Sequence, residues 1–246
     1  MREREARWER KGVTEEEKKA TADFPYRQLL GSLMYLMVGT RFDIAYAVSQ
    51  LARVMSNPGV RHWHALKYLL RYVAGTTSFG IIYTRNTKNF LVCHADASWG
   101  GSEHKRRSVT GYDTSAAGGA IGWKSGLQSL TAMSSLEAEL IASCSALMDA
   151  NWFVNILDEL GYPMDSAVPL YQDNEACVTV IADPARHRST KHMDLRHFYV
   201  TDLLSAQRFI VLWTSTEQQP ADIFTKPLGG DRLRSLVQLL GADYKD

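Results

Sequence analysis

The sequence predicts an α/β fold in which a mixed β-sheet is flanked by helices and preceded by a small helical unit. Apolar residues recur at helical spacing in residues 25–76, and the period then changes to the alternation that is typical of strands. The elements that follow come in the order β-β-β-α-β-α-α-β-α, which mixes hairpin and crossover connections. A chain of 246 residues, 45% of them hydrophobic, is long enough to bury one large core or two small ones.

The first part of the chain is predicted to be helical. Residues 1–24 alternate acids and bases, so we expect a charged lead-in that is either a solvated helix or disordered. Residues 25–85 are the predicted helical segment. Within it two helices separate near Gly39, a turn follows at residues 57–59, and a third helix ends at Gly75.

Residues 86–230 form the predicted sheet domain. A glycine-rich hairpin spans residues 111–125, and a long helix runs from Ser135 to Leu160. The inward side of this helix is expected to carry Ile141, Leu147, Met148, Trp152, Ile156 and Leu157. The other predicted strands are 80–83, 90–96, 169–172 and 209–214, and the other predicted helices are 174–182, 193–204 and 221–225. Residues 231–246 are expected to form a C-terminal helix and then DYKD, which looks like the start of an epitope tag and is expected to lie outside the fold.

Composition excludes several classes of protein. The net charge is +1, so binding to a polyanion must come from local clusters of basic residues. The three cysteines lie far apart and form no Cys-x-x-Cys pair, which argues against a disulfide framework and a cysteine zinc site. The N-terminus is too charged for a signal peptide, and no apolar run approaches membrane-spanning length. We therefore expect a reduced, intracellular setting and no membrane partner.

Two glutamates, Glu137 and Glu139, stand one residue apart at the start of the long helix and cannot share a face. Ser134 and Glu137 match a capping box, in which the glutamate reaches back to the N–H of the capping serine. Glu139 has no such role, and it lies on the face that should contact the sheet. A carboxylate there must be exposed, paired or bound to a metal. Glu139 is therefore the better candidate for chemistry.

Three aspartates stand where a predicted strand ends or a helix begins. Asp96 ends FLVCHAD, Asp173 ends LYQD, and Asp222 opens the last short helix. Each one alone is more often a turn or capping residue. Ends of strands are also where open α/β sheets place their ligands, and convergent carboxylates are what Mg²⁺ requires. Two acids at strand ends and a third at a helix start therefore favour a metal site.

Several motifs together resemble a known family. HADASWGG, KRRSVTGY, AIGWKS, SSLEAELIA, YQDN, KHMDLRHF and QQPADIFTKPL resemble the ribonuclease H domain of copia-type LTR retrotransposon polyproteins. The upstream YRQLLGSLMYLMVGTRFDIAYAVSQLAR and LKYLLRYVAGT resemble the segment that joins the reverse transcriptase to that domain. The resemblance covers about residues 24–230 and implies a ribonuclease H-like fold with a five-stranded mixed sheet. It also implies four metal-binding acids, namely Asp96, Glu139, Asp173 and Asp222.

The resemblance implies a metal-dependent endonuclease that hydrolyses the RNA strand of RNA–DNA hybrids and leaves 5′-phosphomonoesters. Two Mg²⁺ ions would assist, with Mn²⁺ as a substitute. The expected partners are the hybrid and the missing reverse transcriptase portion of the polyprotein. The expected location is the cytoplasm or a virus-like particle, with the nucleus as an alternative. Many cellular ribonucleases H carry a histidine shortly before the last aspartate, whereas TSTEQQPAD holds none, which puts the turnover rate in doubt.

Basic and aromatic side chains are candidates for contact with nucleic acid. Charge runs are usually solvated faces, but beside a phosphate-cleaving centre they are expected to contact the backbone. The basic candidates are Lys105, Arg106, Arg107, Lys124, Arg188, Lys191 and His192. For Trp99 and Trp123, packing in the core is the favoured interpretation.

Alternatives to the nuclease remain at this stage. No Asp-Asp dipeptide occurs, so the polymerase motif is missing and DNA synthesis by this chain is not expected. An integrase-type nuclease is disfavoured because its zinc-binding region is absent. The main alternative is a catalytically silent, co-opted module of the same fold that binds nucleic acid or protein.

Overall fold

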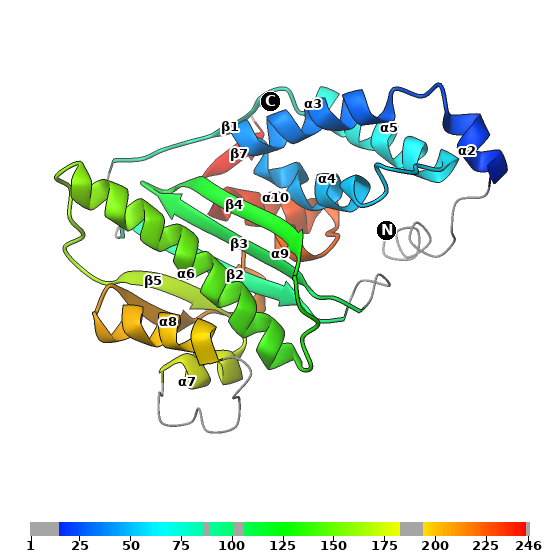
Figure 1. The fold of residues 1–246 in the computed structure, drawn as a ribbon. Coiled ribbons are helices and arrows are strands. Elements are labelled where there is room, and N and C mark those ends of the chain that lie inside the picture. Colours follow the sequence, from blue (N-terminus) through cyan, green and yellow to red (C-terminus); the bar gives the residue numbers. More distant parts are fainter. Residues whose placement is uncertain (1–14, 86–88, 101–105, 183–193, 245–246) are drawn as a thin grey trace.

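A five-stranded mixed sheet forms the centre of the molecule (Figure 1), as the sequence predicts. The structure is a computed structural model, and it describes residues 15–85, 89–100, 106–182 and 194–244. The strand order is β4-β3-β2-β5-β6; the first three strands are antiparallel, and β5 and β6 continue parallel to β2. The strands are β2 (Leu91–Ser98), β3 (Val109–Ala116), β4 (Gly119–Leu127), β5 (Val168–Gln172) and β6 (Phe209–Trp213).

The long helix α6 (Ser135–Glu159) crosses one face of the sheet and forms the main core with it (Figure 1). Its buried residues include a stripe of Ala142, Ala146 and Ala150 at a spacing of four, which lets the helix lie close to the strands. The prediction that Met148 and Trp152 face inward is wrong, because both are 58% exposed. The alanines line the side of α6 that lies closest to the sheet, so Met148 and Trp152 lie on the outer side of the helix.

By length and composition, α6 is the one helix within the described ranges that is apolar enough to cross a membrane. This corrects the expectation that no apolar run reaches that length. Half of its apolar window is buried inside the protein.

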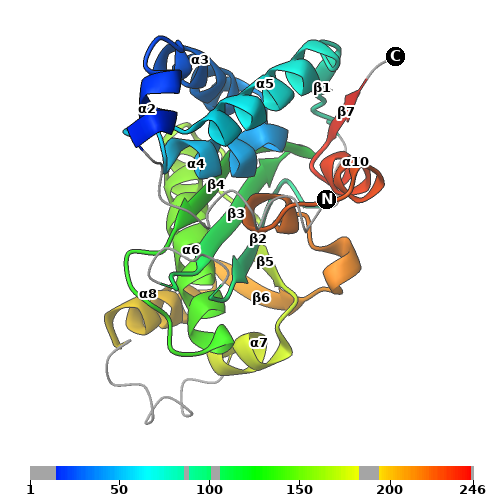
Figure 2. The same cartoon turned by 90° about the vertical axis from the view of Figure 1, so that its right-hand side faces the viewer.

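Four more helices that the structure describes cover the two faces of the sheet (Figure 2). Those beside α6 are α7 (Glu175–Ala182) and α8 (Asp194–Ser205). Those on the opposite face are α9 (Asp222–Thr225) and α10 (Gly230–Leu239). The short helix α9 contacts β2, β3 and β4. It can do so because Gly111 of β3 lacks a side chain: a Cβ there would lie 2.5 Å from Thr225 Cγ2 and 2.9 Å from the Ala221 carbonyl oxygen.

The predicted helical unit is present and packs against β4, the edge strand of the sheet. Its elements are α2 (Glu15–Thr21), α3 (Tyr26–Gly39), the 3₁₀ helix η1 (Phe42–Ile44), α4 (Ala45–Ala52) and α5 (Val60–Ala74). The unit has a core of its own, but Phe42 belongs instead to a second core with α9 and α10. The Trp123 indole N–H also donates to the Met37 carbonyl at 3.0 Å. The unit and the sheet domain therefore share buried contacts.

The C-terminal residues are part of the fold. β1 (Phe79–Ile81) pairs antiparallel with β7 (Ala242–Tyr244), outside the main sheet. The Tyr244 and Tyr72 hydroxyls lie 2.8 Å apart, and Tyr72 donates to Asp43, which also accepts two bonds from Arg41. The expectation that DYKD lies outside the fold is therefore wrong for Asp243 and Tyr244. Local sequence gave no sign of it, because the partner strand is more than 160 residues away.

Candidate metal centre

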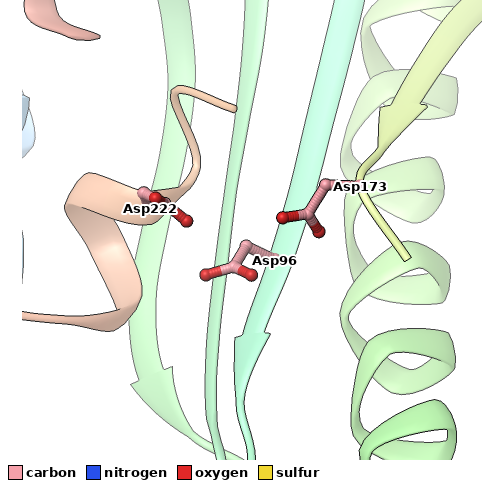
Figure 3. Close-up of side chains that lie close together, drawn as sticks. All are labelled: Asp96, Asp173 and Asp222. Atoms are coloured by element: carbon pink, nitrogen blue, oxygen red, sulfur yellow. The ribbon is translucent and has the colours of Figure 1, made fainter. Parts of the chain in front are cut away.

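Three of the predicted acids meet at one edge of the sheet. Asp96 comes from β2, Asp173 directly follows β5, and Asp222 is the first residue of α9. One carboxylate oxygen from each of them lies within 4.8 Å of the corresponding oxygens of the other two, and Figure 3 shows Asp96 between the other two. Asp96 and Asp222 are buried, and Asp173 is half-buried. This arrangement is the one that the strand-end positions of the sequence indicated.

The register of the two parallel strands explains how Asp96 and Asp173 meet. His94 of β2 pairs with Tyr171 of β5, and each aspartate stands two residues further along its strand. Because parallel strands run in the same direction, both acids reach the same edge of the sheet. No further residue pairs link β2 and β5 beyond His94 and Tyr171 among the described residues. There the buried Gln219 donates to the carbonyls of Ala95, at 2.9 Å, and Tyr171, at 3.4 Å, which bridges the two strands.

The third acid is placed from the opposite face of the sheet. Asp96 pairs with Gly111 of β3, and α9 packs on that glycine. The Thr225 hydroxyl of α9 donates a hydrogen bond to Asp96, which connects the helix to β2. Asp222 is thereby brought to Asp96 by packing against Gly111.

Glu139 lies beside this group but is not one of the three mutually close acids. Its carboxylate is buried and accepts a bond from Gln172 Nε2 at 3.2 Å. Burial, reinforced by the charges of Asp96 and Asp173, raises its pKa to about 9. At neutral pH, in the absence of a cation, the carboxyl group is therefore protonated.

The start of α6 separates the two glutamates, as the sequence indicated. The Ser134 hydroxyl accepts a bond from the Glu137 N–H at 3.1 Å and caps the helix. The Glu137 carboxylate accepts from the N–H of Met133 at 2.7 Å, one residue before the cap. The prediction had named the N–H of Ser134 for this bond. The extended backbone of Ser134 brings the N–H of Met133 within reach of the carboxylate.

Two cations lie against the acids, and sequence reasoning singled out neither of them. Lys226 Nζ is 2.6 Å from Asp222 Oδ1 and 4.0 Å from Asp96 Oδ2, and Arg232 lies 3.6 Å from Asp222. The spacing of four between Asp222 and Lys226 in DIFTK was the signal that could have identified this pair. Burial raises the pKa of Asp96 to about 6 despite the nearby Lys226 ammonium. Burial likewise raises the pKa of Asp222.

Neutral hydrogen bonds hold the half-buried acid in place. The Thr216 hydroxyl donates to Asp173 Oδ2 at 2.8 Å, and the Trp213 indole donates to the Asp173 carbonyl at 3.2 Å. Gln172 accepts bonds from the N–H groups of Asp173 and Asn174. Sequence reasoning missed these residues, because each is an ordinary polar residue until the fold brings it to the acids.

The predicted nucleic-acid contacts are only partly within the described residues. Arg106 is exposed and Arg107 half-buried in the segment between β2 and β3. Lys124 pairs in register with Tyr112 on the α6 side of the sheet, where its charge lowers the pKa of Asp149. It therefore lies on the face of the sheet opposite to α9, which carries Asp222. Trp123 packs in the second core as expected, whereas Trp99 is 56% exposed, which corrects its assignment to the core. Lys105, Arg188, Lys191 and His192 lie outside the described residues.

Comparisons with known proteins identify relatives over most of the chain. A retrovirus-related Pol polyprotein from transposon TNT 1-94 of Nicotiana tabacum is 37% identical over 229 residues, which are 93% of this chain and 17% of that protein. The Pol polyprotein from transposon RE2 of Arabidopsis thaliana is 33% identical over 88% of this chain and 15% of its own length. The chain thus spans about a sixth of these relatives. The secreted RxLR effector protein 161 of Plasmopara viticola is 42% identical over 128 residues, which are 52% of this chain and 90% of the effector.

No protein-family model matches the chain. Among solved structures, LC11-RNase H1 from compost superposes with a TM-score of 0.44 and 16% identity, covering 56% of this chain and 93% of its own. Its complex with an RNA/DNA hybrid gives a TM-score of 0.43 and 14% identity, covering 55% of this chain and 93% of its own. The sequence relatives and the topology of the sheet lead to one conclusion. The chain belongs to the family of the Pol polyproteins of copia-type retrotransposons and has a ribonuclease H-like fold.

Proposed function

We propose that the chain is a metal-dependent endonuclease that hydrolyses the RNA strand of RNA–DNA hybrids. The observation that carries the proposal is the convergence of Asp96, Asp173 and Asp222 from three separate elements, so that one carboxylate oxygen of each lies within 4.8 Å of the others. Carboxylate oxygens are the ligands that Mg²⁺ prefers. The ammonium of Lys226 lies against two of these acids, so the position attracts a cation. The donor set therefore fits divalent ions, with Mg²⁺ first and Mn²⁺ as a substitute.

The residues around the acids have distinct roles in this proposal. Divalent ions, when bound, supply an activated water and positive charge for the leaving oxygen. The three aspartates and Glu139 would hold these ions. Lys226, which is 36% exposed, offers its ammonium to the phosphate of the scissile bond. The oxygen of water bonds to phosphorus, the bond from phosphorus to the 3′ oxygen breaks, and a proton from the water ends on the 3′ oxygen, which leaves a 5′-phosphate and a 3′-hydroxyl.

The choice of an RNA–DNA hybrid rests on the relatives, which are Pol polyproteins of elements named as retrovirus-related. A protein distinguishes such a hybrid by its 2′-hydroxyls and helix shape rather than by sequence. Arg106 and Arg107 follow the strand that carries Asp96, so they are suited to contact the backbone phosphates. The reverse transcriptase portion of the polyprotein is the second partner that we propose.

A cleavage assay with a matched variant tests the proposal. The wild type and Asp96→Asn are incubated with end-labelled hybrid, duplex RNA and duplex DNA, each with and without Mg²⁺. We expect Mg²⁺-dependent cleavage of the hybrid by the wild type alone, because asparagine keeps the shape of the side chain but lacks its charge. If neither protein cleaves the hybrid, or if both cleave it equally, the proposal that the chain is a metal-dependent nuclease is refuted.

A second candidate is a co-opted binding module without catalysis. One comparison favours it, since a secreted effector protein matches this chain over 90% of the effector's own length. The same experiment separates the two. Binding of the hybrid by the wild type, with no cleavage at any Mg²⁺ concentration, would support the binding module.

A further inference from the structure

The side chain of Gln172 is completely buried between α6 and the residue that follows β5. Its amide makes four hydrogen bonds. The oxygen accepts from the N–H groups of Asp173, at 2.8 Å, and Asn174, at 3.2 Å. The nitrogen donates to Glu139 Oε2 at 3.2 Å and to the Ser143 hydroxyl at 3.1 Å. Both ends of the amide are therefore fully used.

This amide connects two acids that come from different elements. Glu139 belongs to α6 and Asp173 follows β5, so their relative placement depends on how the helix sits on the sheet. A hydrogen-bonded amide at the contact sets that placement directly. It adds no net charge, whereas lysine or arginine at the same position would pair with Glu139 and compete with a bound cation. A neutral amide places no competing positive charge beside either acid when a cation binds.

We propose that Gln172 is a positioning residue that sets Glu139 and Asp173 in the geometry required for binding a divalent cation. This inference rests on the proposed function, because it takes both acids as ligands. Gln172 does not itself contact the substrate or the cation and acts through the two acids. Constellations of this kind tolerate deviations of only about 0.5 Å, which a single well-packed partner can enforce.

The test uses two substitutions of Gln172 and one matched control. Gln172→Glu keeps the two bonds that the oxygen accepts but replaces the donor to Glu139 by an acceptor. Gln172→Met keeps the length of the side chain and removes all four bonds. Ser143→Ala is the control, because it removes one bond of the same amide and leaves both links to the acids.

Binding of Mn²⁺ to the full chain, without nucleic acid, is measured by titration calorimetry, and the melting temperature is measured in parallel. We expect both Gln172 variants to bind Mn²⁺ about 10-fold or more weakly, as is usual when a partner of a ligand is removed. Ser143→Ala should keep the affinity of the wild type although its melting temperature falls. In the cleavage assay, kcat of the Gln172 variants should fall at unchanged KM for the hybrid, and added Mn²⁺ should restore part of it.

The outcomes separate this inference from the proposed function. Mn²⁺ affinities in both Gln172 variants that equal or exceed that of the wild type would overturn the inference, whatever the cleavage assay gives. If Gln172→Glu does not fold, Gln172→Met decides by the same criterion. If the wild type binds Mn²⁺ but does not cleave the hybrid, the proposed nuclease activity is refuted. The Mn²⁺ affinities of the wild type and the Gln172 variants can still be compared, so the inference about Gln172 is still tested. A wild type that binds no Mn²⁺ would refute both.

Discussion

Replacement of Gly111 by alanine tests how the fold places Asp222. A Cβ at this position would lie 2.5 Å from Thr225 Cγ2 and 2.8 Å from Phe224 Cβ, both of which belong to α9. Non-bonded carbon atoms rest about 3.5–4.0 Å apart, so α9 has to move away from β3 by about 1 Å. Asp222 begins that helix, and Thr225 holds Asp96, so two of the three clustered acids are affected.

The expected cost has two parts. Overpacking a tight contact lowers the free energy of unfolding by about 1–3 kcal/mol. A displacement of about 1 Å at a catalytic group reduces the rate by about 100-fold. Gly111→Ala should therefore lose about 100-fold in cleavage rate while it remains folded, because the acids no longer converge.

The assay is Mg²⁺-dependent cleavage of a labelled hybrid, with chemical denaturation measured on the same samples. Gly126→Ala is the matched control, since it is also a strand glycine, yet a Cβ there would meet only Lys124 Cε at 3.8 Å. We expect Gly126→Ala to cleave at nearly the rate of the wild type. Wild-type cleavage by Gly111→Ala, or equal losses in the two variants, would refute the argument that α9 depends on Gly111.

Four further predictions concern the glutamates and the C-terminal strand. Glu137→Ala should lower the free energy of unfolding by about 0.5–2 kcal/mol and keep residual activity. Glu139→Gln can still accept the bond from Gln172, so it should leave the free energy of unfolding at neutral pH nearly unchanged or higher. It should abolish cleavage. The reverse pattern in these two variants would show that the roles of Glu137 and Glu139 are exchanged. The pKa of Glu139 is raised from 4.5 to about 9, so between these values the folded protein holds a proton that the unfolded chain has lost. The free energy of unfolding without cations should therefore fall as pH rises through this window, by at most about 1.4 kcal/mol per pH unit from this group. Denaturation at several pH values checks this, and an equal slope in Glu139→Gln would contradict it. Tyr244→Phe removes the contact with the Tyr72 hydroxyl and should cost about 0.5–1.5 kcal/mol without changing cleavage; an unchanged melting temperature would mean that β7 contributes nothing through this bond.

Much of the candidate site could be predicted from local sequence. Asp96 and Asp173 stand at the ends of strands, and parallel strands bring such residues to one edge of a sheet. Ser134 sets the first residue of α6, and that start places Glu139 in the second turn, facing the sheet. These inferences succeed because they depend on contacts within a few residues.

Predictions failed where distant segments compete for the same surface. Met148 and Trp152 fit an inward helical pattern, but the alanine stripe of α6 approaches the sheet more closely and excludes them. Asp243 and Tyr244 resembled an added tag, yet they pair with β1 near the other end of the chain. Hydrophobic periodicity identifies the apolar faces of a helix, but it does not predict which of two apolar faces packs against the sheet.

The sequence by itself predicted the main strands and helices, the start of α6 and the positions of Asp96, Asp173 and Asp222 at the ends of strands or the start of a helix, because capping, periodicity and strand ends are local properties. Only the tertiary structure decided which groups surround those acids. Lys226 beside Asp96, Gln172 between Glu139 and Asp173, and α9 on Gly111 depend on packing between segments far apart in the chain. Polar residues such as these are unremarkable in sequence, and their position next to buried carboxylates is what gives them a role.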